Sequence, residues 1–161
     1  MLVEFNTLPE HSKVWIYQCN RRFTEEELEL VSTKTSEFLE QWAAHGTGLK
    51  AGFELKYERF IIIAVNQDEQ SATGCSIDAS VRFIQDLEQE LDVELLDKMN
   101  VAFKQGNFVN YKPLLDFKKM AKSGAIGKKT IVFNNLVTDI SEYNQNWEVP
   151  ANESWHSRFF N

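Results

Sequence analysis

The pattern of apolar and polar positions predicts three strands in the first part of the chain. Residues 14–17 form a short apolar run rich in strand-favouring types, and residues 51–57 alternate as in a half-buried strand. Residues 60–65 are apolar at every position. A strand with two apolar faces belongs at the centre of a sheet, so we expect 60–65 to be the central strand.

Helical spacing of apolar residues predicts two helices between and after these strands. The first begins with a capping box, in which Thr24 and Glu27 each accept a hydrogen bond from the other residue's backbone amide. It is expected to end at the glycines of 45–48. The second covers 76–91, where one apolar stripe recurs along the helix.

The last third of the chain is expected to add a hairpin, two helices, a strand and an aromatic tail. Lys118, Lys119 and Lys122 complement the negative end of the first of these helices. The tail, 147–160, is expected to dock on the body of the protein, because a free tail of this composition would expose a large apolar surface. The elements are expected at 101–103 and 108–111 (hairpin), 113–124 (helix), 130–133 (strand) and 139–147 (helix).

The order of the first six elements is that of a ferredoxin-like β-α-β-β-α-β unit. In this topology we expect strands 14–17 and 60–65 to be parallel neighbours at the centre of the sheet. The prediction is an α+β protein with a ferredoxin-like core and a C-terminal extension of hairpin, helix, strand and packed tail. A chain of 161 residues is expected to form a single domain, 1–161.

Composition and charge narrow the classes of function. A formal charge of −7 argues against a general nucleic-acid binder, which needs a basic face, although a local basic patch is compatible with it. The chain does not begin like a signal peptide, and no segment has the roughly 18–20 apolar residues that span a bilayer. Two cysteines without a signal peptide indicate reduced thiols, so we expect a cytoplasmic protein that is not bound to a membrane.

Neither a metal nor a cofactor is predicted. The three histidines are widely spaced and there is no CxxC motif. The segment 124–130 has glycines and lysines like a phosphate loop, but Lys129 stands where the motif needs a hydroxyl after Lys128. The segment also follows a predicted helix and leads into a strand, which is the reverse of a phosphate loop. We interpret it as a helix end and a turn.

Two polar segments would meet at one crevice if the ferredoxin-like order holds. Residues 19–22 and 74–76 would both follow the carboxyl ends of central parallel strands, beside the amino ends of the two major helices. Helix amino ends bind anions and lower the pKa of a nearby thiol. Cys75 is the candidate catalytic residue, and the candidate binding residues are Cys19, Asn20, Arg21, Arg22, Ser76 and Asp78.

The same residues also fit an architectural interpretation, which we favour. In it Ser76 or Asp78 caps a helix and both cysteines fill space. A catalytic Cys–His pair would need His156 or His11 to reach Cys75, and a redox pair would need Cys19 to do so.

Five short motifs together carry a resemblance over nearly the whole chain. The motifs are VWIYQ (14–18), WAAHG (42–46), GCSID (74–78), NNLVT (134–138) and WEVP (147–150). They resemble those of a family of small uncharacterised bacterial proteins that often carry the label "ABC transporter ATPase". The label implies ATP hydrolysis, but the chain has no phosphate loop, signature motif or second acidic motif, so the resemblance brings no functional residues.

The sequence therefore predicts a binding or assembly protein without catalytic activity. The alternative is a small enzyme or anion-binding protein that uses Cys75 at a helix amino end with Arg21 and Arg22. A homodimer formed through the aromatic segment 147–161 is a further hypothesis, and nucleic acid is not an expected partner.

Overall fold

The structure is a computed structural model in which residues 1–160 are described, and it divides into two compact units. The N-terminal unit contains Met1–Leu96 and Thr138–Ile140, and the C-terminal unit contains Asp97–Val137 and the chain from Ser141 onward. Each unit has its own hydrophobic core. A division into two compact units does not show whether they fold together, so the single domain, 1–161, stays a prediction.

The mixture of helices and strands confirms the α+β class. The first 96 residues contain η1 (Phe5–Thr7), β1 (Lys13–Gln18), α1 (Glu25–Gln41), β2 (Ala43–Ala44), β3 (Thr47–Gly48), β4 (Lys50–Lys56), β5 (Phe60–Asn66) and α2 (Gly74–Leu91). The rest of the chain contains β6 (Asn100–Gln105), β7 (Phe108–Pro113), α3 (Leu114–Ser123), β8 (Ile131–Phe133), α4 (Ile140–Asn146), β9 (Glu148–Pro150), η2 (Ala151–Glu153) and η3 (Trp155–Phe159).

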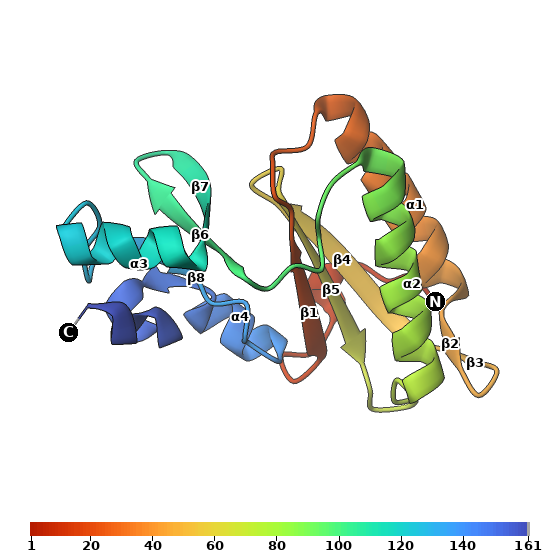
Figure 1. Ribbon diagram of the computed structural model, residues 1–161. Helices are drawn as coiled ribbons and strands as arrows, with labels where there is room; N and C mark the ends of the chain where they lie inside the picture. Colours follow the sequence, from red (N-terminus) through yellow and green to blue (C-terminus); the bar gives the residue numbers. More distant parts are fainter. Residues whose placement is uncertain (161) are drawn as a thin grey trace. The chain divides into compact units, whose positions relative to one another are not determined.

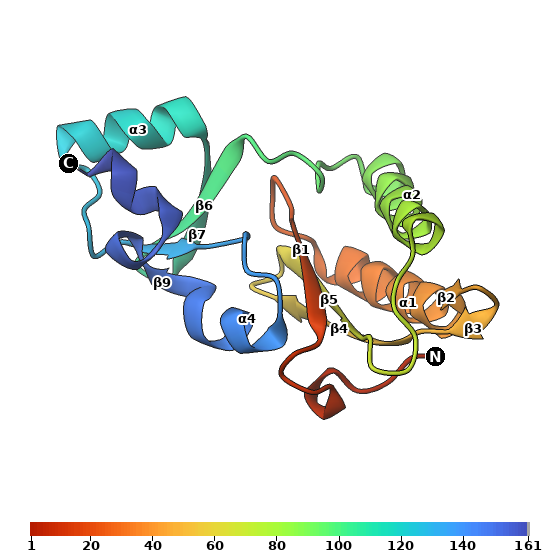
Figure 2. The same ribbon diagram turned by 90° about the horizontal axis from the view of Figure 1, so that it is seen from below.

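The N-terminal unit is built on a three-stranded sheet with the order β1-β5-β4. β5 lies between β1 and β4, which confirms it as the central strand, and every residue from 60 to 65 is buried. Ile61, Ile63 and Val65 belong to the core that also contains buried residues of α1 and α2. These two helices lie side by side on one face of the sheet (Figures 1 and 2).

The predicted parallel pairing of the first and third strands is wrong. β1 and β5 are neighbours, but they run antiparallel, with Lys13 opposite Val65 and Gln18 opposite Phe60. The short turn after β4 reverses the chain, so β5 runs opposite to β4, whereas the crossover through α1 returns β4 in the direction of β1. β5 therefore lies antiparallel to both of its neighbours.

The ferredoxin-like order as a whole is not confirmed. The expected fourth strand, β6, belongs to a different sheet, whose order is β7-β6-β8-β9. The end of α1 also differs from the prediction, because the helix ends at Gln41 rather than at the glycines. Ala43–Ala44 then pairs with Thr47–Gly48 across a tight turn in which His45 and Gly46 have positive φ angles of 50° and 77°.

The C-terminal unit confirms the predicted hairpin, helix and strand. β6 and β7 pair antiparallel around Gly106, and α3 ends at Gly124, whose φ of 81° suits a glycine. The aromatic tail packs on the protein itself, within the C-terminal unit. The rings of Phe159 and Phe160 lie 5.9 and 6.2 Å from the ring of Phe117, which is fully buried.

Within residues 1–160, no helix has the length and apolar character needed to cross a membrane.

Gly52 in β4 is expected to tolerate no side chain. A Cβ there would lie 2.8 Å from the carbonyl oxygen of Val3 and 3.0 Å from Cα of Phe5, both of which are backbone atoms. We expect Gly52→Ala to lower the free energy of unfolding in urea by about 1–3 kcal/mol. Gly74→Ala is the matched control, because a Cβ at Gly74 meets no atom within 4 Å. Equal unfolding midpoints for the two variants would contradict this close packing.

Candidate functional site

The two polar segments predicted to share a crevice lie at opposite ends of α1. Cys19 immediately follows β1, and α1 begins a few residues later at its N-cap, Thr24. At the other end of α1, the indole N–H of Trp42 donates to the carbonyl oxygen of Ser76 at 2.8 Å. A helix of 17 residues separates these points by about 25 Å. The predicted shared crevice is therefore wrong, and both Cys19 and Cys75 are free thiols.

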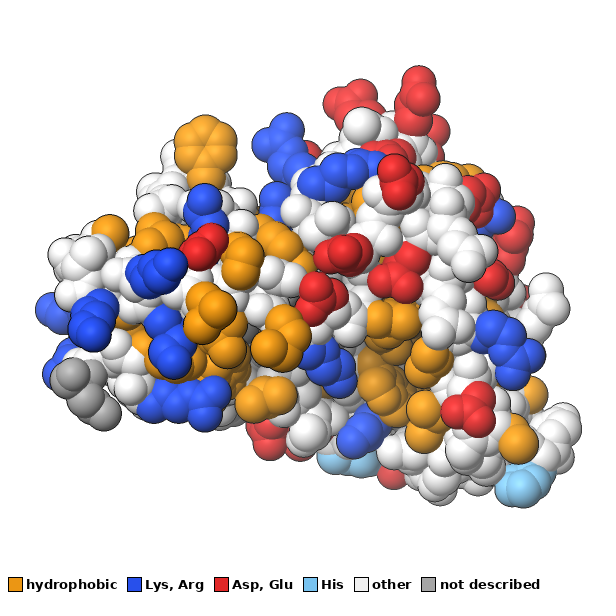
Figure 3. Space-filling model, viewed as in Figure 1, with side chains coloured by type: hydrophobic (Ala, Val, Ile, Leu, Met, Phe, Trp, Pro, Cys, Tyr) orange, Lys and Arg blue, Asp and Glu red, His pale blue; other side chains and the backbone are white. Residues whose placement is uncertain are grey.

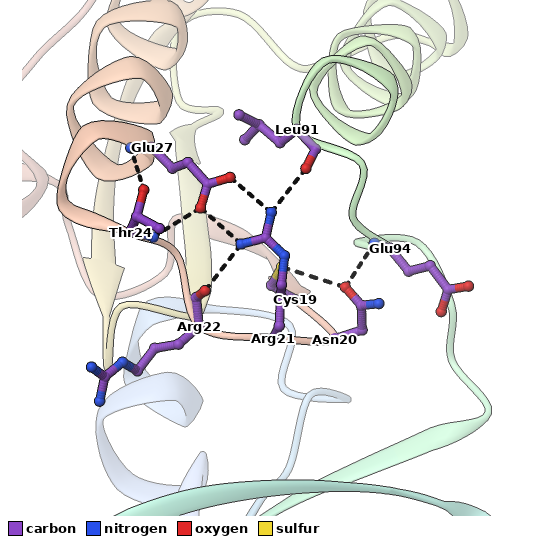
Figure 4. Close-up of polar contacts among 8 residues, drawn as sticks. All are labelled: Cys19, Asn20, Arg21, Arg22, Thr24, Glu27, Leu91 and Glu94. Carbon is purple, nitrogen blue, oxygen red and sulfur yellow. Dashed lines mark hydrogen bonds and ion pairs between the residues drawn. The ribbon is translucent and has the colours of Figure 1, made fainter.

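Arg21 joins the start of α1 to the end of α2 (Figure 4). Its two terminal nitrogens donate to the two carboxylate oxygens of Glu27, each at 2.7 Å, and one of them also donates to the carbonyl oxygen of Leu91 at 2.9 Å. The guanidinium is the main reason that the pKa of Glu27 falls from 4.5 to about 2. Arg21 thus uses most of its donors on the protein itself rather than on a ligand.

The neighbours of Arg21 also have internal partners. Asn20 makes two hydrogen bonds with the backbone of Glu94, at 2.9 and 3.2 Å. Cys19 is fully buried, and burial raises the pKa of its thiol. Arg22 is exposed and pairs with Glu58 at 3.1 Å. The segment 19–22 is therefore a joint between elements, and a buried thiol with a raised pKa is a poor nucleophile.

The start of α2 shows a capping box between Thr73 and Ser76. The backbone N–H of Thr73 donates to the Ser76 hydroxyl at 2.6 Å, and the backbone N–H of Ser76 donates to the Thr73 hydroxyl at 3.3 Å. Ser76 is buried, whereas Cys75 and Asp78 are exposed. Of the residues predicted at this helix start, only Cys75 and Asp78 are accessible.

Cys75 lines an open groove of about 920 Å³ between α1 and α2. Phe38, Trp42 and Phe83 form part of its wall, with the rings of Phe38 and Phe83 stacked at 4.5 Å. His45, which was not among the predicted partners of Cys75, lines the same groove. Among the described residues, however, no hydrogen bond joins Cys75 to a histidine.

The two histidines predicted as partners of Cys75 have other contacts. Nε2 of His11 lies 2.7 Å from a carboxylate oxygen of Asp68 on the surface of the N-terminal unit. His156 is buried in the C-terminal unit, where its Nδ1 lies 2.7 Å from the hydroxyl of Ser154.

A second hollow, of about 680 Å³, lies within the C-terminal unit and is strongly basic. Positions 115, 118, 119 and 122 lie on one exposed face of α3, while Phe117 faces the core. Figure 3 shows the Lys and Arg side chains gathered over α3. We call this hollow the basic groove; its lining includes Lys118, Lys119, Lys122, Lys128, Arg158, Leu115, Phe159 and Phe160.

Two cations of the basic groove, Arg158 and Lys118, lie beside aromatic rings rather than carboxylates. The guanidinium of Arg158 lies 5.2 Å from the ring centre of Trp155 and 5.1 Å from that of Phe159, and Nζ of Lys118 lies 5.9 Å from the latter. Within residues 1–160, none of the five cations forms an ion pair. Burial, aided by the charge of Arg158, lowers the pKa of His156 to about 4, so this histidine is uncharged at neutral pH.

The two units carry opposite formal charges. The C-terminal unit has nine Lys and Arg against five Asp and Glu, or +4, whereas the N-terminal unit has eight against nineteen, or −11. The total of −7 conceals this separation. In the sequence, Lys118, Lys119 and Lys122 were interpreted only as partners of a helix dipole. Their helical spacing is the signal from which a basic face could have been predicted.

Comparisons with protein-family models, with curated proteins and with solved structures found no match. The family resemblance inferred from the sequence therefore stays a prediction. Within the described part of the chain, no group of three or more His, Cys, Asp or Glu side chains is placed to hold a metal ion.

Arg21 is expected to stabilise the fold, and Arg22 is its natural control. We expect Arg21→Ala to lower the free energy of unfolding at pH 7 by about 1–2 kcal/mol, because charged hydrogen bonds are lost from a partly exposed site. Arg22→Ala should change it by less than about 0.5 kcal/mol.

The effect of Arg21→Ala is also expected to depend on pH. The pKa of Glu27 is lowered in the folded protein, so the contribution of the pair is present above pH 4.5 and is lost as the pH falls toward 2. Urea unfolding over this pH range should show the difference between variant and wild type shrinking. Equal destabilisation by the two arginine variants at pH 7 would contradict the role of Arg21 as a joint.

The two thiols are expected to differ sharply in reactivity. A thiol reagent at neutral pH should label one cysteine in the native protein, Cys75, and both in denaturant, because Cys19 is fully buried. Cys75→Ser should abolish the native reaction. Rapid native labelling of that variant at Cys19 would show that the joint opens in solution.

Proposed function

We propose that this chain is a binding protein without catalytic activity, and that its ligand is a polyanion held in the basic groove. The observation that carries the proposal is the gathering of five exposed cations around one hollow of an otherwise acidic protein. A cytoplasmic location and a bacterial origin belong to the same proposal; the two free thiols support the first and the sequence resemblance supports the second.

The electrostatics of the basic groove favour an anionic ligand. Five like charges on one small surface repel one another, and their field is not reduced by ion pairs among the described residues. A polyanion would relieve this repulsion and would release the ions condensed on it. The charge of −11 on the N-terminal unit would repel the same ligand, so binding is expected to be local to the C-terminal unit.

The geometry gives less support to the enzyme alternative. Arg21 and Arg22 lie near the start of α1, whereas Cys75 lies near its other end. An anionic substrate held by these arginines would therefore be far from the thiol. Arg21 is also engaged by Glu27 and Leu91.

Fluorescein-labelled heparin tests the proposal with a ligand that offers only negative charge. We expect the wild-type protein to bind it at low salt, and Lys118→Gln/Lys122→Gln to weaken binding by about tenfold. The control, Lys50→Gln/Lys56→Gln, removes the same charge from the N-terminal unit and should bind as the wild type does. No binding at low salt, or equal weakening by the two double variants, would refute the proposal.

A further inference from the structure

We infer that the polyanion is a single-stranded nucleic acid, with its phosphates on the lysines of α3 and a base stacked against Arg158 and Phe159. This inference rests on the proposed function and narrows it. The observation behind it is that two cations of the basic groove, Arg158 and Lys118, lie over flat aromatic rings, which a ligand recognised by charge alone does not require.

Arg158 offers a planar surface at the edge of the basic groove. Its side chain is exposed, and its guanidinium lies over Trp155 and Phe159 at 5.2 and 5.1 Å. Guanidinium planes and aromatic rings are the surfaces on which proteins stack unpaired bases. A base can therefore stack on the guanidinium, or on the ring of Phe159 if the arginine turns toward a phosphate.

The rings beneath Arg158 are held in place by the core. Phe159 meets the rings of Phe117 and Trp155 edge to face, at 5.9 and 6.0 Å, and Phe117 is fully buried. The neutral imidazole of His156 stacks on Trp155 at 3.8 Å. Such a platform loses little conformational freedom when a ligand binds, so stacking on it is not offset by a large ordering cost.

The lysines of α3 provide a track beside this platform. Residues three and four positions apart on a helix are neighbours, with about 5–6 Å between their Cβ atoms, so Lys118, Lys119 and Lys122 form a continuous cationic strip. Leu115, which is 69% exposed, lies on the same face. Backbone phosphates can follow such a strip while the bases turn toward the rings, as in other single-strand binding grooves.

Other polyanions fit this arrangement less well. A duplex keeps its bases paired and stacked, so they cannot reach rings that line a hollow. A membrane surface needs several apolar side chains that project outward. Of the large apolar residues lining the groove only Leu115 is exposed, whereas Phe159 and Phe160 are partly buried and pack against Phe117. An acidic protein would satisfy the lysines but would have no specific use for a guanidinium held over two rings.

Fluorescence anisotropy with labelled single strands of about 12 nucleotides, both oligo(dT) and oligo(U), tests the inference on the full chain. Arg158→Lys keeps the charge but removes the plane, so it should weaken binding of the single strands by about 5-fold to 150-fold. Its heparin affinity should stay within about twofold of the wild type. Arg22→Lys, the same exchange at an exposed arginine of the N-terminal unit, should leave both affinities unchanged.

Two further variants separate stacking from charge. Phe159→Leu keeps an apolar side chain against Phe117 and should weaken single-strand binding without changing heparin binding; thermal unfolding checks that the variant is folded. Lys122→Gln should make the salt dependence of single-strand binding shallower by about 0.7 in the slope of log affinity against log salt.

The outcomes distinguish this inference from the proposed function. If heparin binds but Arg158→Lys and Phe159→Leu bind the single strands as the wild type does, stacking is refuted and the binding of a polyanion stands. Equal or tighter binding of a duplex of the same length also refutes it, as does tighter binding to phosphatidylserine vesicles. If neither heparin nor the single strands bind at low salt, both proposals fall.

Discussion

The N-terminal unit depends on the burial of one strand, β5, on both faces and along both edges. Its six residues from 60 to 65 are all buried, and β1 and β4 pair with its two sides. Burying each of the larger aliphatic side chains contributes about 1.5–3 kcal/mol. Because both of its edges are paired, β5 has no open edge. The direction of β5 determines at which end of the sheet α2 begins, and therefore which end of α2 lies near the start of α1.

The direction of β5 determines which of the candidate site residues lie close together. With β5 antiparallel to β1, the segment 19–22 meets the start of α1 and the end of α2, where backbone groups lack helical partners. Arg21 binds one such group, the carbonyl oxygen of Leu91, and Asn20 binds the backbone of Glu94 just beyond the end of α2. Residues that resemble an anion site in the sequence are thus used to join two helix ends, and Cys75 is left with a different set of neighbours along the groove between α1 and α2.

The two units differ in charge as well as having separate hydrophobic cores. The N-terminal unit is acidic over α1 and α2, and the C-terminal unit presents lysines over α3 (Figure 3). The basic groove forms because the aromatic tail docks on Phe117, which brings Arg158 to the lysines of α3. The packing of the tail thereby connects the core of this unit to its proposed ligand surface.

Local patterns in the sequence determined much of the fold. The capping box at Thr24, the strand at 60–65 and the end of α3 at Gly124 depend on near neighbours in the chain, and all three were predicted. The short turn between β4 and β5 also determines the direction of β5, although β1 and β5 were wrongly predicted to be parallel. Tertiary contacts alone decided the rest, such as the end of α1 near Trp42, whose indole binds Ser76. Lys118 and Arg158 are forty positions apart, so only the packing of the tail could place them around one hollow.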